Sequence, residues 1–252
     1  MSPVDTAIQA LLQARRSGQP VPAPALPDAE AAYAVQDGVA EALGWFGDVP
    51  PLAWKSGGPS RTAGQTHAPL PGAGVWASPA DAARQPFRRR GIEAEVALRI
   101  GRPVDAASAA GLDVDAARAL VDVMAVTIEV VDSRWAEGAT AAPALAKLAD
   151  LQSHGALVIG DWAAYDPAHD WSRQVCTVSV GEAEPRRFVG THSMGDPAWV
   201  LPAWLRHVTR DGRTLRAGTL VTTGTWCGLL DAQPGDAVEV RFDGIGGARV
   251  QF

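Results

Sequence analysis

The chain has 252 residues, of which 47% are hydrophobic and 20% are charged, as in a globular protein with a substantial core. Its net charge of −6 gives no electrostatic reason to expect nucleic acid or an anionic membrane as a partner. We find no signal peptide and no apolar stretch of about 18 residues that would span a bilayer. The two cysteines lack metal-type spacing, so we expect a cytoplasmic protein without disulfides.

Residues 1–50 are expected to be a helical segment packed on the main domain. Residues 6–16 carry apolar side chains on one side, and Gly18 follows as a helix stop. A proline-rich extended linker then leads to Asp28, a plausible N-cap for a second helix over residues 29–43.

From residue 51 to 252 the pattern changes to short apolar runs separated by glycine and proline, which predicts many strands in one domain. Residues 114–120 and 196–207 are expected to be helical. The expected strands cover residues 92–100, 123–135, 157–159, 175–180, 186–189, 219–223 and 237–242.

The most informative stretch is the strand over residues 92–100, in which apolar residues alternate strictly with Glu93, Glu95 and Arg99. Because side chains leave a strand on alternate faces, both glutamates point to the same side. Glu129 lies within a second apolar stretch, where a buried side chain is expected, and a lone buried carboxylate is costly. If the two strands are neighbours, the three carboxylates could converge on one hard cation, Mg²⁺ or Mn²⁺.

Two ordinary explanations compete with a metal site. Glu93 and Glu95 could lie on a solvated strand face beside Arg99. Glu129 could form a structural ion pair with Arg134 or Lys55.

Lys55 stands before a glycine-rich turn, and its side chain could either reach the surface or enter a pocket. The segment 222–228 is rich in hydroxyl groups and glycine, and could serve either as a carboxylate-binding loop or as an ordinary strand exit. His67, His154 and His192 show no nucleophile or metal spacing, which favours structural roles. Nucleotide-binding loops and serine elbows are absent from the sequence.

Taken together, these segments resemble the fumarylacetoacetate hydrolase superfamily, and within it the 2-keto-4-pentenoate hydratase branch. The resemblance runs from about Ala29 to the C-terminus, and the order and spacing of the glutamates are its specific part. Departures occur at Leu151, where the family usually carries asparagine, at His154, where a small residue is common, and in the Gly-Gly-Pro loop of residues 56–61.

The resemblance implies an α+β fold, a mixed β-roll with an N-terminal helical segment. It implies that Mg²⁺ or Mn²⁺ is bound by Glu93, Glu95 and Glu129 and chelated by a 2-oxo acid substrate. The catalytic residues would be Lys55, Asp150 and Ser153, and a lysine that is desolvated beside the metal can have a lowered pKa. The substrate-binding residues would be Gly224, Thr225, Arg134 and His154.

The activity that the resemblance implies is a metal-dependent hydratase that adds water to a 2-hydroxy-2,4-dienoate and forms a 4-hydroxy-2-oxo acid. Decarboxylation of a 2-oxo-3-enedioate and C–C hydrolysis of an acylpyruvate are alternatives on the same fold. A non-catalytic partner subunit is a further alternative, although an intact trio of glutamates argues against it. The resemblance also implies a homo-oligomer, for which nine tryptophans offer weak support.

Overall fold

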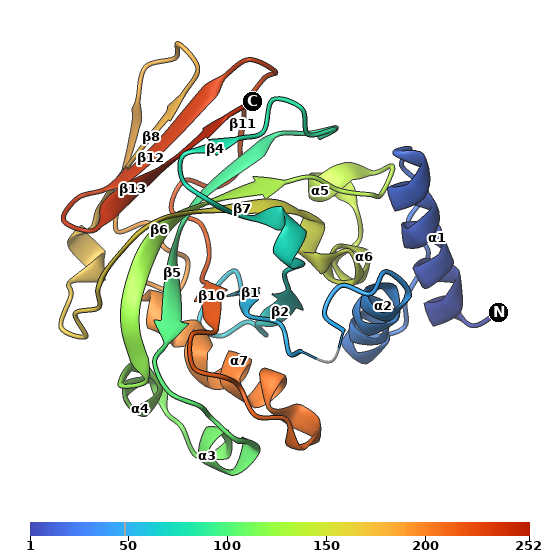
Figure 1. The fold of residues 1–252 in the computed structure, drawn as a ribbon, viewed down its shortest axis with the longest axis horizontal. Coiled ribbons are helices and arrows are strands. Elements are labelled where there is room, and N and C mark those ends of the chain that lie inside the picture. The colour runs from blue at the N-terminus through green and yellow to red at the C-terminus, as the bar shows by residue number, and fades with distance from the viewer. Residues whose placement is uncertain (48) are drawn as a thin grey trace.

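Two curled β-sheets form the frame of the protein, and the helices lie in two separate groups beside the larger sheet (Figure 1). A computed structural model describes residues 1–47 and 49–252. Its helices are α1 (Pro3–Ser17), α2 (Ala29–Ala42), α3 (Ala106–Ala110), α4 (Val114–Arg118), α5 (Gly138–Ala141), α6 (Ala144–Ala149) and α7 (Leu201–Val208). Its strands are β1 (Ala53–Gly57), β2 (Thr66–Pro69), β3 (Val75–Ala77), β4 (Ala80–Asp81), β5 (Gly91–Ile100), β6 (Val121–Val131), β7 (His154–Ala164), β8 (Val175–Val180), β9 (Arg186–Val189), β10 (Leu220–Thr222), β11 (Leu230–Asp231), β12 (Ala237–Phe242) and β13 (Gly246–Gln251).

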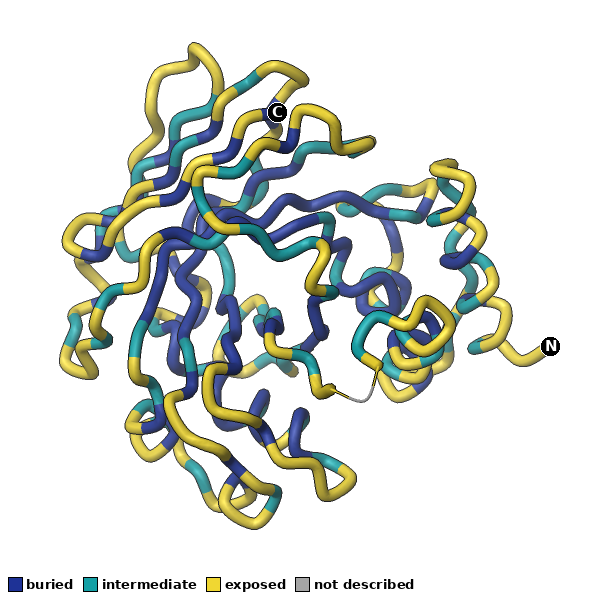
Figure 2. Tube along the Cα trace, in the orientation of Figure 1, coloured by how far each residue is buried: buried dark blue, intermediate teal, exposed yellow. Residues whose placement is uncertain are grey.

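The larger sheet has the strand order β2-β1-β10-β5-β6-β7-β3, with β11 paired to β5, and the smaller has the order β4-β13-β12-β8-β9. The long antiparallel strands β5 and β6 are mostly buried, whereas β7 becomes exposed toward its C-terminal end (Figure 2). Apolar side chains of β6 and β12, such as Ile128 and Val240, share one core with Trp226, so both sheets rest on the same apolar interior. Mixed helix and curled sheet is the α+β architecture that the sequence predicts.

Helices α1 and α2 pack with α6 around a second apolar cluster that includes Leu11, Val35 and Leu148. The capping predictions are confirmed here: α1 ends at Gly18, whose φ is 67°, and the Asp28 carboxylate accepts a hydrogen bond of 2.8 Å from the backbone N–H of Ala31. Among the described residues we find no helix with the length and apolar character that crossing a bilayer requires.

Strand β7 is longer than its predicted core of residues 157–159 because two glycines that look like strand ends lie inside it. A Cβ at Gly155 would lie 2.8 Å from the Val130 carbonyl oxygen, and one at Gly160 would collide with the Gly247 carbonyl of β13. These glycines therefore permit close approach of neighbouring strands instead of ending the strand.

The helix predicted over residues 196–207 is divided into a 3₁₀ turn, Pro197–Val200, and α7. Pro202 lies in the first turn of α7, where its missing N–H is tolerated. A longer α-helix that continued toward the N-terminus would bring the proline ring against the carbonyl four residues earlier.

Candidate metal centre and active site

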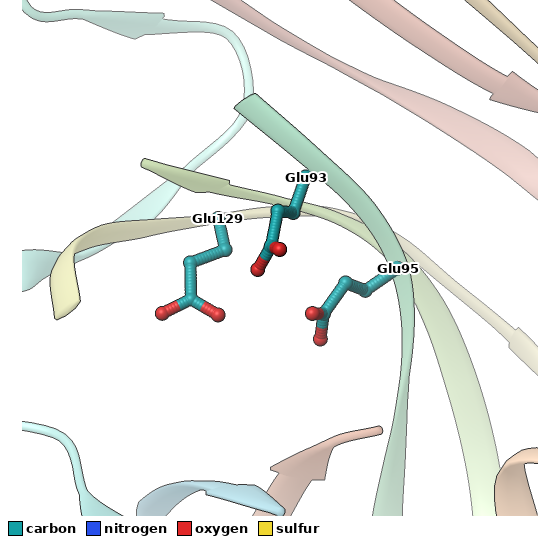
Figure 3. A group of neighbouring side chains, drawn as sticks. All are labelled: Glu93, Glu95 and Glu129. Carbon is teal, nitrogen blue, oxygen red and sulfur yellow. The ribbon is translucent and has the colours of Figure 1, made fainter. Parts of the chain in front are cut away.

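Three glutamates from β5 and β6 converge on one point, as Figure 3 shows. Glu93 is directly opposite Glu129 in the β5–β6 ladder, and Glu95 lies two residues further along β5, on the same face. One carboxylate oxygen from each lies within 4.8 Å of the others. The convergence predicted from the strand pattern is confirmed, and a solvated face for these residues is excluded because Glu95 and Glu129 are buried.

Burial and mutual repulsion make the trio electrostatically costly. Burial, and then the negative charge of Glu129, raises the pKa of Glu93 to about 8 and that of Glu95 to about 7. Burial also acts to raise the pKa of Glu129, but the Lys55 ammonium and a hydrogen bond with His154 outweigh burial and lower it. Glu129 is therefore the carboxylate that stays ionised most readily.

Lys55 reaches this centre from β1, where it pairs in register with Thr222 of β10. Its Nζ donates to Glu129 Oε1 at 2.5 Å, so the ion pair considered from sequence is formed by Lys55. Burial acts to lower the pKa of Lys55, but the carboxylates of Glu129, Glu93 and Glu95 outweigh it and raise that pKa. Without a bound cation, the carboxylates therefore hold this lysine as a cation.

The residues fit a divalent cation. Three buried carboxylates face one lysine, an imbalance of two negative charges that a dication would offset. The buried Glu129 Oε2 has no hydrogen-bond partner among the described residues. An all-carboxylate donor set suits a hard cation such as Mg²⁺, and not zinc or copper.

Strand β10 and the segment after it orient Glu95. The Thr222 hydroxyl donates to Glu95 Oε2, and the Gly224 N–H donates to the same oxygen at 3.1 Å. The backbone N–H of Gly224, which the sequence assigned to the substrate, thus supports a candidate metal ligand. The Thr225 hydroxyl donates to the Gly228 carbonyl at 3.0 Å, so it too is engaged within its own loop.

Since protons and a cation compete for the same oxygens, we expect Mg²⁺ to stabilise the protein more as pH rises. The pKa values of Glu93 and Glu95 lie above their ordinary value of 4.5, so the folded state binds their protons more tightly than the unfolded state. The metal-free protein should therefore lose stability as pH rises from the ordinary glutamate pKa of 4.5 to the raised value of about 8. The increase in melting temperature on adding a fixed Mg²⁺ concentration should be larger at about pH 8.5 than at about pH 6. Equal increases would contradict the assignment.

A cavity of about 440 Å³ opens beside the trio, a size suited to a small molecule. Among the predicted site residues, it is lined by Lys55, Glu93, Glu95, Ser153, Gly224 and Thr225. The Ser153 hydroxyl is buried and has no hydrogen-bond partner among the described residues, so it is available to a ligand. Sequence reasoning missed Gln152, Lys147 and Ser56 in this lining.

Asp150 and Arg134, predicted to be catalytic and substrate-binding, are not among the residues that line this cavity; they pair with one another instead. Asp150 is completely buried, and Arg134 Nε donates to its Oδ1 at 2.5 Å. Arg15 of α1 adds a second ion pair at 3.6 Å. Arg134 also donates to the carbonyls of Asp150 and His154. This network fastens the segment between α6 and β7, in which three consecutive residues, 151–153, have positive φ.

His154 is likewise not among the residues that line the cavity. Its buried Nδ1 is 3.2 Å from Glu129 Oε1, the oxygen that also accepts from Lys55. The geometry therefore makes His154 a support for Glu129, while its predicted contact with substrate stays a prediction.

Comparison with known sequences places this site in a family. The sequence model described as fumarylacetoacetate (FAA) hydrolase C-terminal matches residues 64–252, well over half of the chain. The chain belongs to the FAA hydrolase family. The matched region contains all three glutamates and most of the cavity lining, but not Lys55, which precedes it.

Curated relatives within the FAA hydrolase family carry two activities in their names. The chain is 27% identical over 161 residues to a 2-keto-4-pentenoate hydratase of Paraburkholderia xenovorans, a match that spans 64% of this chain and only 58% of the relative. It is 26% identical over 130 residues to a 4-oxalocrotonate decarboxylase of a Pseudomonas species, covering 52% of this chain and 49% of that protein.

A solved structure of the same family shares the whole fold. The 4-oxalocrotonate decarboxylase of Pseudomonas putida G7, complexed with magnesium and adipate, superposes with a TM-score of 0.83 at 19% identity. The superposition covers 99% of this chain and 97% of the other. The fold, including the N-terminal helices that the family model does not reach, is therefore that of a known family member.

Proposed function

We propose that this protein is a divalent-metal-dependent hydratase that adds water to a 2-hydroxy-2,4-dienoate and forms a 4-hydroxy-2-oxo acid. The observation that carries the proposal is the buried trio of Glu93, Glu95 and Glu129 with Lys55 at one wall of a cavity of about 440 Å³. The hydratase name of the relatives supports this choice of reaction. The magnesium and calcium in the names of structural neighbours support a divalent cation.

The trio would hold the cation, which when bound supplies a Lewis acid that polarises the 2-oxo group and stabilises enolate charge. The chain's own residues orient the substrate and hold protons. The Lys55 ammonium, kept protonated by its carboxylate neighbours, donates hydrogen bonds toward the cavity and stabilises the enolate oxygen. The free Ser153 hydroxyl offers a further hydrogen bond to the substrate. Lys55 therefore stands where its side chain can hydrogen-bond the enolate oxygen or pass a proton to the substrate.

A decarboxylase is the second candidate, because one curated relative carries that name and enolate stabilisation serves loss of CO₂ equally well. In that reaction the same residues would hold a 2-oxo-3-enedioate. The bond between C5 and the distal carboxylate carbon would break, and no water would add at C4.

The test is a direct assay of the purified chain with Mg²⁺ on 2-hydroxypenta-2,4-dienoate and on 2-oxohex-3-enedioate. Loss of dienoate absorbance with formation of a 4-hydroxy-2-oxo acid supports the hydratase. Release of CO₂ from the diacid without hydration supports the decarboxylase. If neither compound is consumed in the presence of metal, both proposals fail.

A further inference from the structure

The turn between α6 and β7 has an unusual backbone. Leu151, Gln152 and Ser153 have φ values of 51°, 55° and 59°, so three consecutive residues adopt the left-handed conformation. This conformation is costly for residues with a Cβ, and it persists only where surrounding contacts enforce it. Two of the three residues, Gln152 and Ser153, line the cavity beside the glutamate trio. Strain at this place points to a role in the site.

The last residue of the turn and its middle residue are held in different ways. The Ser153 N–H donates to the Asp150 carbonyl at 2.9 Å, and the Ser153 carbonyl accepts from the Asp132 N–H at 2.8 Å. Gln152 is held by its side chain, whose Nε2 donates to the Thr66 hydroxyl of β2 at 2.5 Å. This hydrogen bond, which we call the Thr66 latch, ties the middle of the turn to an edge strand of the larger sheet.

The latch lies beside Lys55. Thr66 pairs with Gly57, which lies two residues after Lys55 on β1, so the Thr66 and Lys55 side chains leave the sheet on the same face. The Gln152 carbonyl oxygen lies 3.4 Å from Lys55 Nζ, and among the described residues it is the only acceptor of this ammonium besides Glu129 Oε1. A cation bound by Glu129 would compete with Lys55 for that carboxylate. The Gln152 carbonyl would then be the protein contact that keeps the ammonium at the cavity.

We propose that Thr66 and Gln152 are positioning residues, whose hydrogen bond holds the left-handed turn in the form that keeps Lys55 and Ser153 aimed at the substrate. The inference rests on the proposed function, in which the Lys55 ammonium and the Ser153 hydroxyl contact the substrate. The latch acts through these two groups and does not itself touch the reacting atoms. Without it, the strained middle residue relaxes, and both groups lose their alignment.

Direct contact with the substrate is the competing explanation, because Thr66 and Gln152 also line the cavity. Loss of a contact that binds substrate and transition state equally raises KM and leaves kcat unchanged. Loss of alignment lowers kcat with little change in KM, because small displacements of reacting groups are enough to slow the reaction. Steady-state kinetics therefore separates the two roles.

The test uses Thr66→Val, which keeps the shape of the side chain and removes the hydroxyl. We expect kcat to fall by about 10- to 100-fold at saturating Mg²⁺ on whichever compound the wild-type protein consumes, the dienoate or the enedioate, while KM changes by less than about threefold. In the metal-free protein without substrate, the backbone N–H groups of residues 151–153 should exchange hydrogen at least about tenfold faster, and those of β5 and β6 at the wild-type rate. Thr66→Ser restores the hydroxyl and should keep most of the activity.

Gln152→Gly separates the latch from the backbone, because glycine adopts the left-handed conformation without strain but carries no amide. It should lower kcat as Thr66→Val does, and the double variant should lose no more than either single variant, since both substitutions remove the same bond. Thr177→Val is the matched control, because it makes the same change on β8 of the smaller sheet, at a residue that does not line the cavity. This control should keep wild-type kcat and exchange rates.

A raised KM with unchanged kcat in Thr66→Val would overturn the inference in favour of direct substrate contact. Wild-type exchange of residues 151–153 in that variant, or additive losses of kcat in the double variant, would overturn it as well. An active protein whose Thr66→Val and Gln152→Gly variants both keep wild-type kcat would refute the latch alone. If the wild-type protein consumes neither compound with Mg²⁺, the proposed function fails and this inference fails with it.

Discussion

Glu129→Gln is expected to abolish metal-dependent turnover and to weaken Mn²⁺ binding by at least about 100-fold while the protein stays folded. The substitution keeps the shape of the side chain but removes the carboxylate that stays ionised most readily and whose Oε2 has no partner among the described residues. It relieves repulsion with Glu93, which lies directly opposite in the β5–β6 ladder, but it also leaves the buried Lys55 ammonium without its charged partner. The melting temperature of the metal-free protein should therefore fall while the fold is kept. Activity, Mn²⁺ titration by electron paramagnetic resonance and thermal melting measure the three effects.

Glu239→Gln provides the matched control, because Glu239 is also a strand glutamate but lies on β12 of the smaller sheet, where it pairs with Arg241 and Arg249. This control should keep wild-type activity and metal affinity. Wild-type activity in Glu129→Gln would show that the glutamate is not a metal ligand.

Lys55→Met is expected to lower kcat by about 10²- to 10⁴-fold, because it removes the fixed cation from the wall of the cavity but keeps the length of the side chain. Metal affinity should be unchanged or slightly higher, since Lys55 competes for the Glu129 Oε1 oxygen that the cation would use. Steady-state kinetics at saturating Mg²⁺ and a parallel Mn²⁺ titration separate the two quantities.

Lys55→Arg tests whether charge alone is sufficient. A guanidinium keeps the charge but not the compact ammonium geometry, so we expect only partial recovery of kcat. If Lys55→Met instead abolished Mn²⁺ binding, the lysine would be part of the structure of the metal site and not of the reaction.

The glutamate trio was predictable because it depends on a local rule. Alternation along residues 92–100 fixed the faces of Glu93 and Glu95, and the apolar context of Glu129 indicated its burial. Which strands are neighbours was the only non-local assumption, and the β5–β6 register confirms it. The helix caps at Gly18 and Asp28 were predictable for the same reason, since caps depend on a few adjacent residues.

The rest of the site depends on contacts between distant segments, which periodicity does not encode. Asp150 looked catalytic in a polar segment, yet Arg134 and Arg15 enclose it in the core. The direction in which the pKa of Lys55 is shifted in the metal-free chain depends on three carboxylates that converge from two other strands. Lys147 lies on the short helix α6, which packs against α2 and the 3₁₀ turn at residues 151–153, and this packing brings it to the cavity.

The most direct test of the metal centre is a crystal structure of the protein soaked with Mn²⁺ and recorded at the manganese absorption edge. The proposed function predicts one strong anomalous peak per chain, coordinated directly by oxygens of Glu93, Glu95 and Glu129. A structure in which these three side chains bind no manganese, with Lys55 still paired to Glu129 and the ion elsewhere, would contradict it.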